Sequence, residues 1–124
     1  MEKSLFERLG GDEGISTIVK RAISLHMENP HINARFLPYK ERPEYFNTVI
    51  QHSINFFNSG SGGPAVYSGR DMETTHRGMN INPEEYMHVI DDIFIALDEN
   101  AIDENTKKDV LAILWSLKGM IIAK

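Results

Sequence analysis

The chain has 124 residues, of which 41% are hydrophobic and 25% are charged, and its formal net charge is −5. This length and balance fit one globular domain with a core, and the acidic charge argues against nucleic acid or an anionic membrane as a partner, because both usually need a basic surface. The absence of cysteine excludes disulfides, thiolate zinc sites, iron–sulfur clusters and thiol nucleophiles, so any metal must be bound by histidine, carboxylate or tyrosine.

The N-terminal half of the chain predicts one long helix followed by short connections. Residues 1–6 lack the apolar run of a signal peptide, and no later stretch is long enough to span a bilayer, so we expect a cytoplasmic protein. Asp12 is predicted to cap a helix with one apolar face that ends before Pro30. Residues 31–36 are expected to form a short turn, and residues 38–42 a polar linker.

Three further helices are predicted. Pro43 suits the first position of a second long helix, which the glycine-rich segment 58–63 should stop. The run Asn82-Pro83-Glu84-Glu85 is a helix start with a cap, a first-turn proline and first-turn acids, and Asp103 can start the last helix. Because no run alternates with a period of two, we predict an all-α fold whose two C-terminal helices form an antiparallel pair.

A candidate metal ligand follows the loop of residues 62–71. This loop is punctuated by glycine and proline, and it leads into a short helical turn that carries Met72 and His76 on one face. Imidazole nitrogen is a good ligand for iron, and Met72 offers soft apolar packing beside it. A single such histidine is more often an ordinary surface or core residue than a ligand, so further features are needed to decide.

The second long helix supplies a second histidine. Val49, His52, Ser53 and Phe56 recur at helical spacing, which puts an imidazole and a hydroxyl on an otherwise apolar face. A cavity between this helix and His76 would be lined by Phe36, Phe56, Phe57, Tyr67, Met72, Ile81, Tyr86 and Leu114. Each of these alone is consistent with ordinary core packing, but together with the histidines they indicate a slot for a flat apolar macrocycle held by an axial imidazole.

The order of several motifs resembles that of the group I truncated, two-over-two haemoglobins. The resemblance rests on the Leu-Phe-Glu-Arg-Leu-Gly-Gly run at residues 5–11, on Phe36, on the Gly-Gly-Pro…Tyr-x-Gly-Arg-x-Met-x-x-x-His run of residues 62–76, and on Ile81 with Tyr86. It covers nearly the whole chain, without gaps from Val49 onward. It implies that residues 1–124 form a single truncated-globin domain.

The resemblance also implies a cofactor and its contacts. Haem b would lie between the second long helix and the His76 segment, with His76 as the proximal iron ligand and His52 as a candidate sixth ligand. The other residues that fall on haem-lining or haem-contacting positions are Phe36, Val49, Ser53, Phe56, Phe57, Tyr67, Arg70, Met72, Thr75, Ile81, Tyr86, Val110 and Leu114. Arg70 and Lys40 are candidates to pair with the haem propionates.

The chain departs from the family pattern on the distal side of the expected haem. Where the family commonly has Tyr on the first long helix and Gln on the distal helix, this chain has Ile23, with Val49 and Ser53. These residues leave bound oxygen without the usual hydrogen-bond donors, for which His52 is the best substitute. His26 is a second candidate for a hydrogen-bond donor on the distal side. The alternative interpretation is that His26 is a hydrogen-bonded residue of the core.

Two functions from different classes follow. The first is a haem protein that binds oxygen, nitric oxide or carbon monoxide. Its role would be that of an oxygen carrier, a sensor or a redox protein, and a redox protein would have a reductase as a further candidate partner. Nitric-oxide dioxygenation is associated with family members that have the Tyr/Gln pair. Because this chain lacks the pair, the sequence argues against that enzyme activity. The second is a haem-free all-α interaction domain on a globin scaffold. The two remaining histidines, His31 and His88, are expected on the surface.

Overall fold

The computed structural model describes residues 3–64, 67 and 71–124. These residues form helices, and their β contact is one isolated parallel bridge between Ile81 and Ile122, so the predicted all-α class is confirmed. Within the described residues, no helix combines the length and the apolar character needed to cross a membrane. In chain order the elements are α1 (Leu5–Arg8), α2 (Gly11–Glu28), the 3₁₀ helices η1 (Asn33–Arg35) and η2 (Leu37–Glu41), α3 (Pro43–Gly60), α4 (Met72–His76), α5 (Pro83–Glu99) and α6 (Glu104–Ile121).

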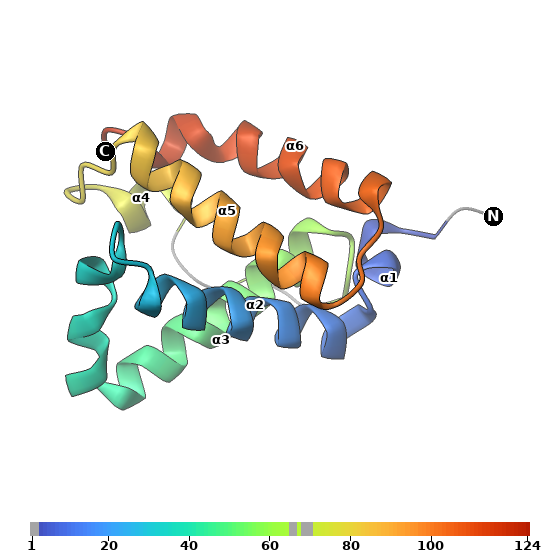
Figure 1. The fold of residues 1–124 in the computed structure, drawn as a ribbon, viewed down its shortest axis with the longest axis horizontal. Helices are drawn as coiled ribbons and strands as arrows, with labels where there is room; N and C mark the ends of the chain where they lie inside the picture. Colours follow the sequence, from blue (N-terminus) through green and yellow to red (C-terminus); the bar gives the residue numbers. More distant parts are fainter. Residues whose placement is uncertain (1–2, 65–66, 68–70) are drawn as a thin grey trace.

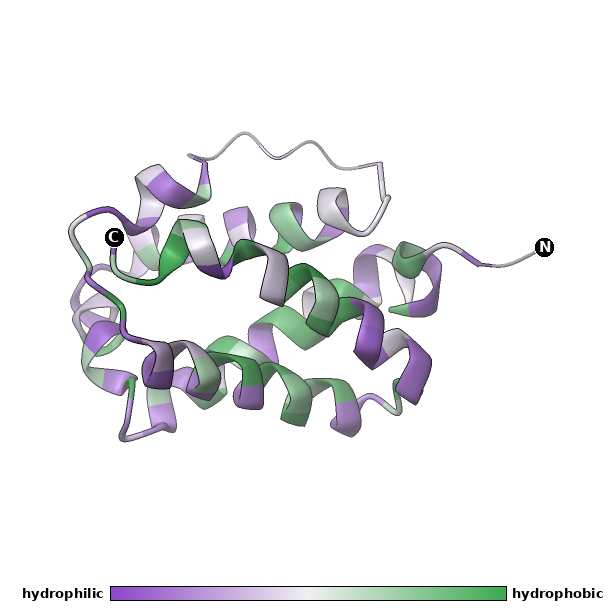
Figure 2. Cartoon of the chain, turned by 90° about the horizontal axis from the view of Figure 1, so that it is seen from above, coloured by the Kyte–Doolittle hydropathy of each residue, from purple (hydrophilic) through white to green (hydrophobic). Residues whose placement is uncertain are grey.

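The four long helices lie in two pairs. In Figure 1, α2 and α3 occupy the lower half of the molecule, α5 and α6 occupy the upper half, and α5 and α6 run antiparallel as predicted. Helix α2 packs against both α3 and α5, and the short α4 packs against α6. Figure 2 shows hydrophobic and hydrophilic residues alternating along the helices, the pattern of elements that bury one face. The core is formed mainly by aliphatic residues of α2, α5 and α6.

Most of the predicted helix starts are confirmed, because their signals are local. Helix α3 begins at Pro43. The Asn82 side chain accepts a hydrogen bond from the backbone N–H of Glu85, whose carboxylate accepts from the Asn82 N–H in return. Asp103 caps α6 by accepting from the Thr106 N–H. Each cap satisfies a backbone donor that the helix itself cannot pair.

The predicted cap of the first long helix is wrong. The residue before α2 is Gly10, whose φ of 98° lies in the left-handed region that favours glycine, so the helix begins at Gly11 rather than after Asp12. Asp12 lies in the first turn of α2, where its carboxylate accepts a hydrogen bond from the side-chain amide of Asn58 on α3. Asp12 therefore joins two helices instead of capping one.

The predicted linker between the first two long helices has a regular structure that was not predicted. Residues 38–42 connect the two helices, but Leu37–Glu41 forms the 3₁₀ helix η2. Pro38 fits the first turn of this helix, where its missing N–H leaves no bond unmade. The turn predicted for residues 31–36 is present and contains η1. Phe36, between the two 3₁₀ helices, and Tyr39 of η2 line the site described below.

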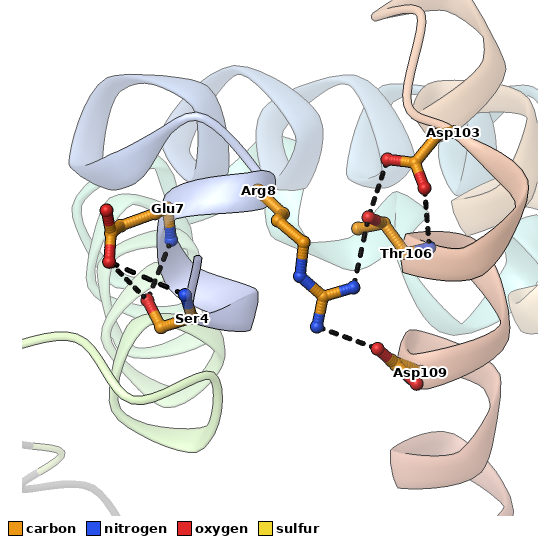
Figure 3. Close-up of polar contacts among 6 residues, drawn as sticks. All are labelled: Ser4, Glu7, Arg8, Asp103, Thr106 and Asp109. Atoms are coloured by element: carbon orange, nitrogen blue, oxygen red, sulfur yellow. Dashed lines mark hydrogen bonds and ion pairs between the residues drawn. The ribbon is translucent and has the colours of Figure 1, made fainter. Parts of the chain in front are cut away.

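A polar cluster fixes the N-terminal helix α1 on the start of α6 (Figure 3). Arg8 donates to the hydroxyl of Thr106 over 3.2 Å, and its second terminal nitrogen lies 2.7 Å from an Asp109 carboxylate oxygen. The Thr106 hydroxyl, which is fully buried, donates in turn to Asp103 over 2.6 Å. These bonds satisfy a buried hydroxyl and anchor the chain end to the last helix.

Candidate functional site

A large cavity of about 510 Å³ lies among α2, α3, α4, α5 and α6. Its walls are mainly apolar, as expected for a site that takes an apolar ligand. The predicted site residues that line it are Phe36, Val49, His52, Ser53, Phe56, Phe57, Tyr67, Met72, Thr75, His76, Ile81, Tyr86, Val110 and Leu114. Arg70 lies outside the described residues. Lys40 is exposed on η2 and does not line the cavity.

His76 is held in one orientation by its own helix. Its Nδ1 lies 2.7 Å from the carbonyl oxygen of Met72, so this nitrogen carries the proton and donates it. The start of α4 is fixed by Asp71, whose carboxylate accepts from the Thr74 N–H over 2.7 Å. These bonds leave the lone pair of Nε2 available, and this tautomer is the one that binds a metal through Nε2.

The α3 wall of the cavity carries His52 and has little other donor capacity. The Ser53 hydroxyl donates to the Val49 carbonyl oxygen of its own helix over 2.9 Å, so its proton is already used. The His52 ring meets the Tyr67 ring edge-on, with centroids 6.1 Å apart. Ile23, on α2, also lines the cavity and has no donor. Of Val49, His52 and Ser53, His52 is therefore the one able to donate a hydrogen bond to a ligand, and Tyr45 at the start of α3 carries a further hydroxyl at the cavity.

An aromatic cluster on η2 and the start of α3 was not predicted. Tyr39 stacks on Phe46 with ring centroids 5.5 Å apart, and it also packs beside Phe36 and Tyr45. All four line the cavity, and burial raises the pKa of the Tyr39 hydroxyl. One feature of the sequence indicates this cluster. Phe36 and Tyr39 are three residues apart, a spacing that puts both side chains on one side of a 3₁₀ helix.

His26 is a hydrogen-bonded core histidine that also lines the cavity, so it stays a distal candidate. Its Nδ1 lies 2.8 Å from a carboxylate oxygen of Asp92 on α5, and both side chains are 7% exposed. The Asn29 amide donates to both oxygens of Asp92 at 3.3 Å. Asp92 was missed, since an acidic residue on a helix is usually solvated and its partner lies 66 positions away in the sequence. Burial lowers the pKa of His26, and the carboxylate of Asp92 opposes that effect.

We expect His26 to make the protein less stable in acid. Because the pKa of His26 is lower in the folded state than its ordinary value of 6.5, the unfolded chain takes up the proton first as the pH falls. The free energy of unfolding should therefore decrease from about pH 7 downward until the folded-state pKa is reached. Urea unfolding between about pH 8 and 5 measures this slope, and His26→Gln should flatten it. An equal slope in both proteins would contradict the assignment.

A second ion pair that was not predicted joins η1 to the start of α5. Arg35 donates to Glu85 through two nitrogens, one of them 3.0 Å from Oε1, and a third donates to the Met79 carbonyl oxygen over 3.0 Å. The paired guanidinium lowers the pKa of Glu85, and Glu85 raises that of Arg35. The pair lines the cavity and ties the chain after His76 to the N-terminal half of the fold.

Tyr86 connects the two C-terminal helices at the cavity wall. Its hydroxyl donates to the Leu114 carbonyl oxygen on α6, and the side chain is buried. Burial raises the pKa of this hydroxyl to about 12, so it stays protonated and continues to donate at neutral pH. This bond positions two of the residues predicted for the site.

The chain matches known proteins over nearly its full length. The model of a family described as bacterial-like globin matches residues 4–123. The group 1 truncated hemoglobin of Tetrahymena thermophila is 25% identical over 126 residues, which cover 89% of this chain and 96% of that protein. The Fe(III) crystal structure of truncated hemoglobin from Tetrahymena pyriformis has a TM-score of 0.89 at 17% identity, covering 98% of this chain and 100% of that one. The crystal structure of the group II truncated hemoglobin from Bacillus anthracis has a TM-score of 0.84 at 19% identity, and the match covers 100% of this chain and 94% of that one.

Proposed function

Because the chain belongs to the bacterial-like globin family and has the two-over-two globin fold, we propose that it is a haem b protein that binds oxygen or another diatomic ligand. The observation that carries this proposal is the hydrogen bond of 2.7 Å from His76 Nδ1 to the Met72 carbonyl oxygen at the wall of a large apolar cavity. A globin uses such an imidazole as its axial ligand. When bound, haem would supply an iron that can bind oxygen, nitric oxide or carbon monoxide.

The residues present fit a haem group. The cavity is large, mainly apolar and lined by several aromatic rings, which suits the flat faces of a porphyrin. The α4 and α5 residues Met72, Thr75 and Tyr86 would pack near the proximal ligand, and Phe36 would pack against the ring plane. Residues of α3 would cover the other face. Arg70 is proposed to pair with a propionate.

The haem-binding proposal is tested by adding haemin to the purified protein. We expect a saturable visible spectrum with one haem per chain, and a shift of the ferrous spectrum when carbon monoxide is added. The alternative, a haem-free interaction domain on a globin scaffold, gives only the spectrum of free haemin at every ratio. The imidazole of His76 favours the first function, since an interaction domain has no need of an oriented imidazole facing an apolar cavity.

The distal side favours reversible ligand binding, as a carrier or sensor, over nitric-oxide dioxygenation. Ile23 and Val49 carry no donor, and the Ser53 proton is bonded within α3. Among the side chains at these distal positions, His52 is the one that would donate a hydrogen bond to a bound ligand, and His26, Tyr39 and Tyr45 are further donors on the cavity wall. Nitric-oxide dioxygenation is associated with relatives that carry the Tyr/Gln pair, and this chain lacks that pair. A redox role would add a reductase as a partner.

We also propose that His52 competes with external ligands for the sixth coordination position. His52 lies on the cavity wall, and its described ring contact is an edge-on one with Tyr67, which rotation of the imidazole would release. Carbon monoxide binding to the ferrous protein should then level off at high ligand concentration, because His52 must leave first. His52→Ala should remove this limit, measured by stopped flow.

A matched surface variant, His31→Ala, should keep the limiting rate of the unmodified protein. A ferrous protein that is five-coordinate and high-spin, with binding kinetics unchanged by His52→Ala, would show that His52 does not bind iron. Its role would then reduce to hydrogen bonding.

A further inference from the structure

A cluster of three metal-ligating side chains lies outside the haem cavity. His31 comes from the turn between α2 and η1, and Glu84 and His88 come from the first two turns of α5. One ligand atom of each, a ring nitrogen or a carboxylate oxygen, lies within 4.8 Å of the other two. We propose that these residues bind a divalent transition metal ion, with Zn²⁺ as the probe.

The donor set suits zinc. Two imidazoles and one carboxylate are ligands that Zn²⁺ takes in proteins, and with three protein ligands the fourth position is left to water. Glu84 and His88 are four residues apart on α5, so they share one face of the helix, and their Oε1 and Nε2 are 3.9 Å apart. His31 closes the set from the neighbouring turn. Hard ions such as Mg²⁺ prefer oxygen ligands and should bind here more weakly.

The two imidazoles are already in contact. The His31 and His88 rings are stacked, with centroids 4.1 Å apart and an angle of 11° between their planes. His31 is exposed, as predicted, whereas the side chain of His88 is only 24% exposed. Zinc bonds of about 2.0–2.2 Å require ligand atoms roughly 3.3 Å apart, so binding would turn the rings out of the stack. Glu84 is 77% exposed and has the space to follow.

The backbone beneath the ligands is fixed, so only side chains need to move. The His31 N–H donates to the side-chain oxygen of Asn29 over 3.0 Å, and the Asn29 amide is held in turn by the buried Asp92. The capping box of Asn82 and Glu85 fixes the first turn of α5. A preformed backbone lowers the entropy lost when the metal binds.

The site is separate from the proposed haem site. None of the described residues that line the large cavity belongs to the cluster. Its metal binding can therefore be measured whether or not haem is bound, and the two proposals can fail independently. The acidic net charge of −5 also favours the approach of a cation.

Isothermal titration of the purified protein with zinc chloride, before and after addition of haemin, tests the proposal. We expect one saturable site per chain, weakened about tenfold or more by His31→Ala and by His88→Ala, since each removes one of three ligands. Asp91→Asn removes an exposed acid of the same helix outside the cluster, and it should leave the zinc affinity unchanged. Circular dichroism checks that each variant keeps its helix content.

Three results would overturn the proposal. The first is the absence of saturable zinc binding to the unmodified protein. The second is zinc binding that both histidine variants retain at full affinity, which would place the metal elsewhere. A fall in affinity equal in Asp91→Asn and Glu84→Gln would also contradict it, because this would indicate attraction by general negative charge rather than by ligation.

Discussion

Replacing His76 by alanine is expected to abolish stable haem binding. The imidazole is the proposed axial ligand, and its Nδ1 is held by the Met72 carbonyl oxygen at 2.7 Å, which leaves Nε2 available to bind iron. Loss of an outer-shell partner alone typically costs about 10–100-fold in metal affinity, and loss of the ligand itself should cost at least that much. Transfer of haem to an excess of a competing apoglobin measures the change.

The visible spectrum gives a second reading of the same variant. His76→Ala should lose the spectrum of an imidazole-bound haem, and added imidazole should restore it in part by entering the vacated space. His31→Ala, a histidine variant on the surface, should behave as the unmodified protein does. An unchanged spectrum together with unchanged haem retention would show that another residue is the axial ligand.

Introducing tyrosine at Ile23 is expected to slow oxygen release. Ile23 is buried on α2 and lines the cavity, where its side chain offers no hydrogen-bond donor. A hydroxyl at this position could donate to bound oxygen, and one hydrogen bond of about 1–1.5 kcal/mol corresponds to roughly a tenfold slower release. Stopped-flow replacement of oxygen by carbon monoxide measures the dissociation rate.

The matched control for this prediction is Ile23→Phe, which adds the same ring without the hydroxyl. Any effect of crowding the cavity should appear in both variants, since overpacking depends on ring volume rather than on the hydroxyl. The ratio of the two dissociation rates therefore isolates the hydrogen bond. Equal rates would mean that another donor already serves the ligand, and adding His52→Ala to both variants would test whether that donor is His52.

The helices and the candidate proximal histidine were predictable because their causes are local. The caps at Asn82 and Asp103 each use a bond that spans three residues. The bond that orients His76 spans four residues within one helix. The start of α2 was missed although its cause is also local, because the left-handed backbone of Gly10 outweighed the capping tendency of Asp12.

The sequence alone thus determined the all-α class and most helix boundaries, since these depend on hydrophobic periodicity and on bonds between near neighbours. Through the family resemblance it also indicated part of the cavity lining, but not Arg35, Tyr39 or Tyr45. Only the tertiary structure decided which polar groups meet inside the fold. Asp92 reaches His26 across 66 positions, and Glu85 reaches Arg35 across 50. The stacking of His31 on His88 likewise depends on how α2 and α5 are placed against each other. No short-range pattern encodes such pairs, because a charged side chain looks solvated in the sequence until packing removes the water around it.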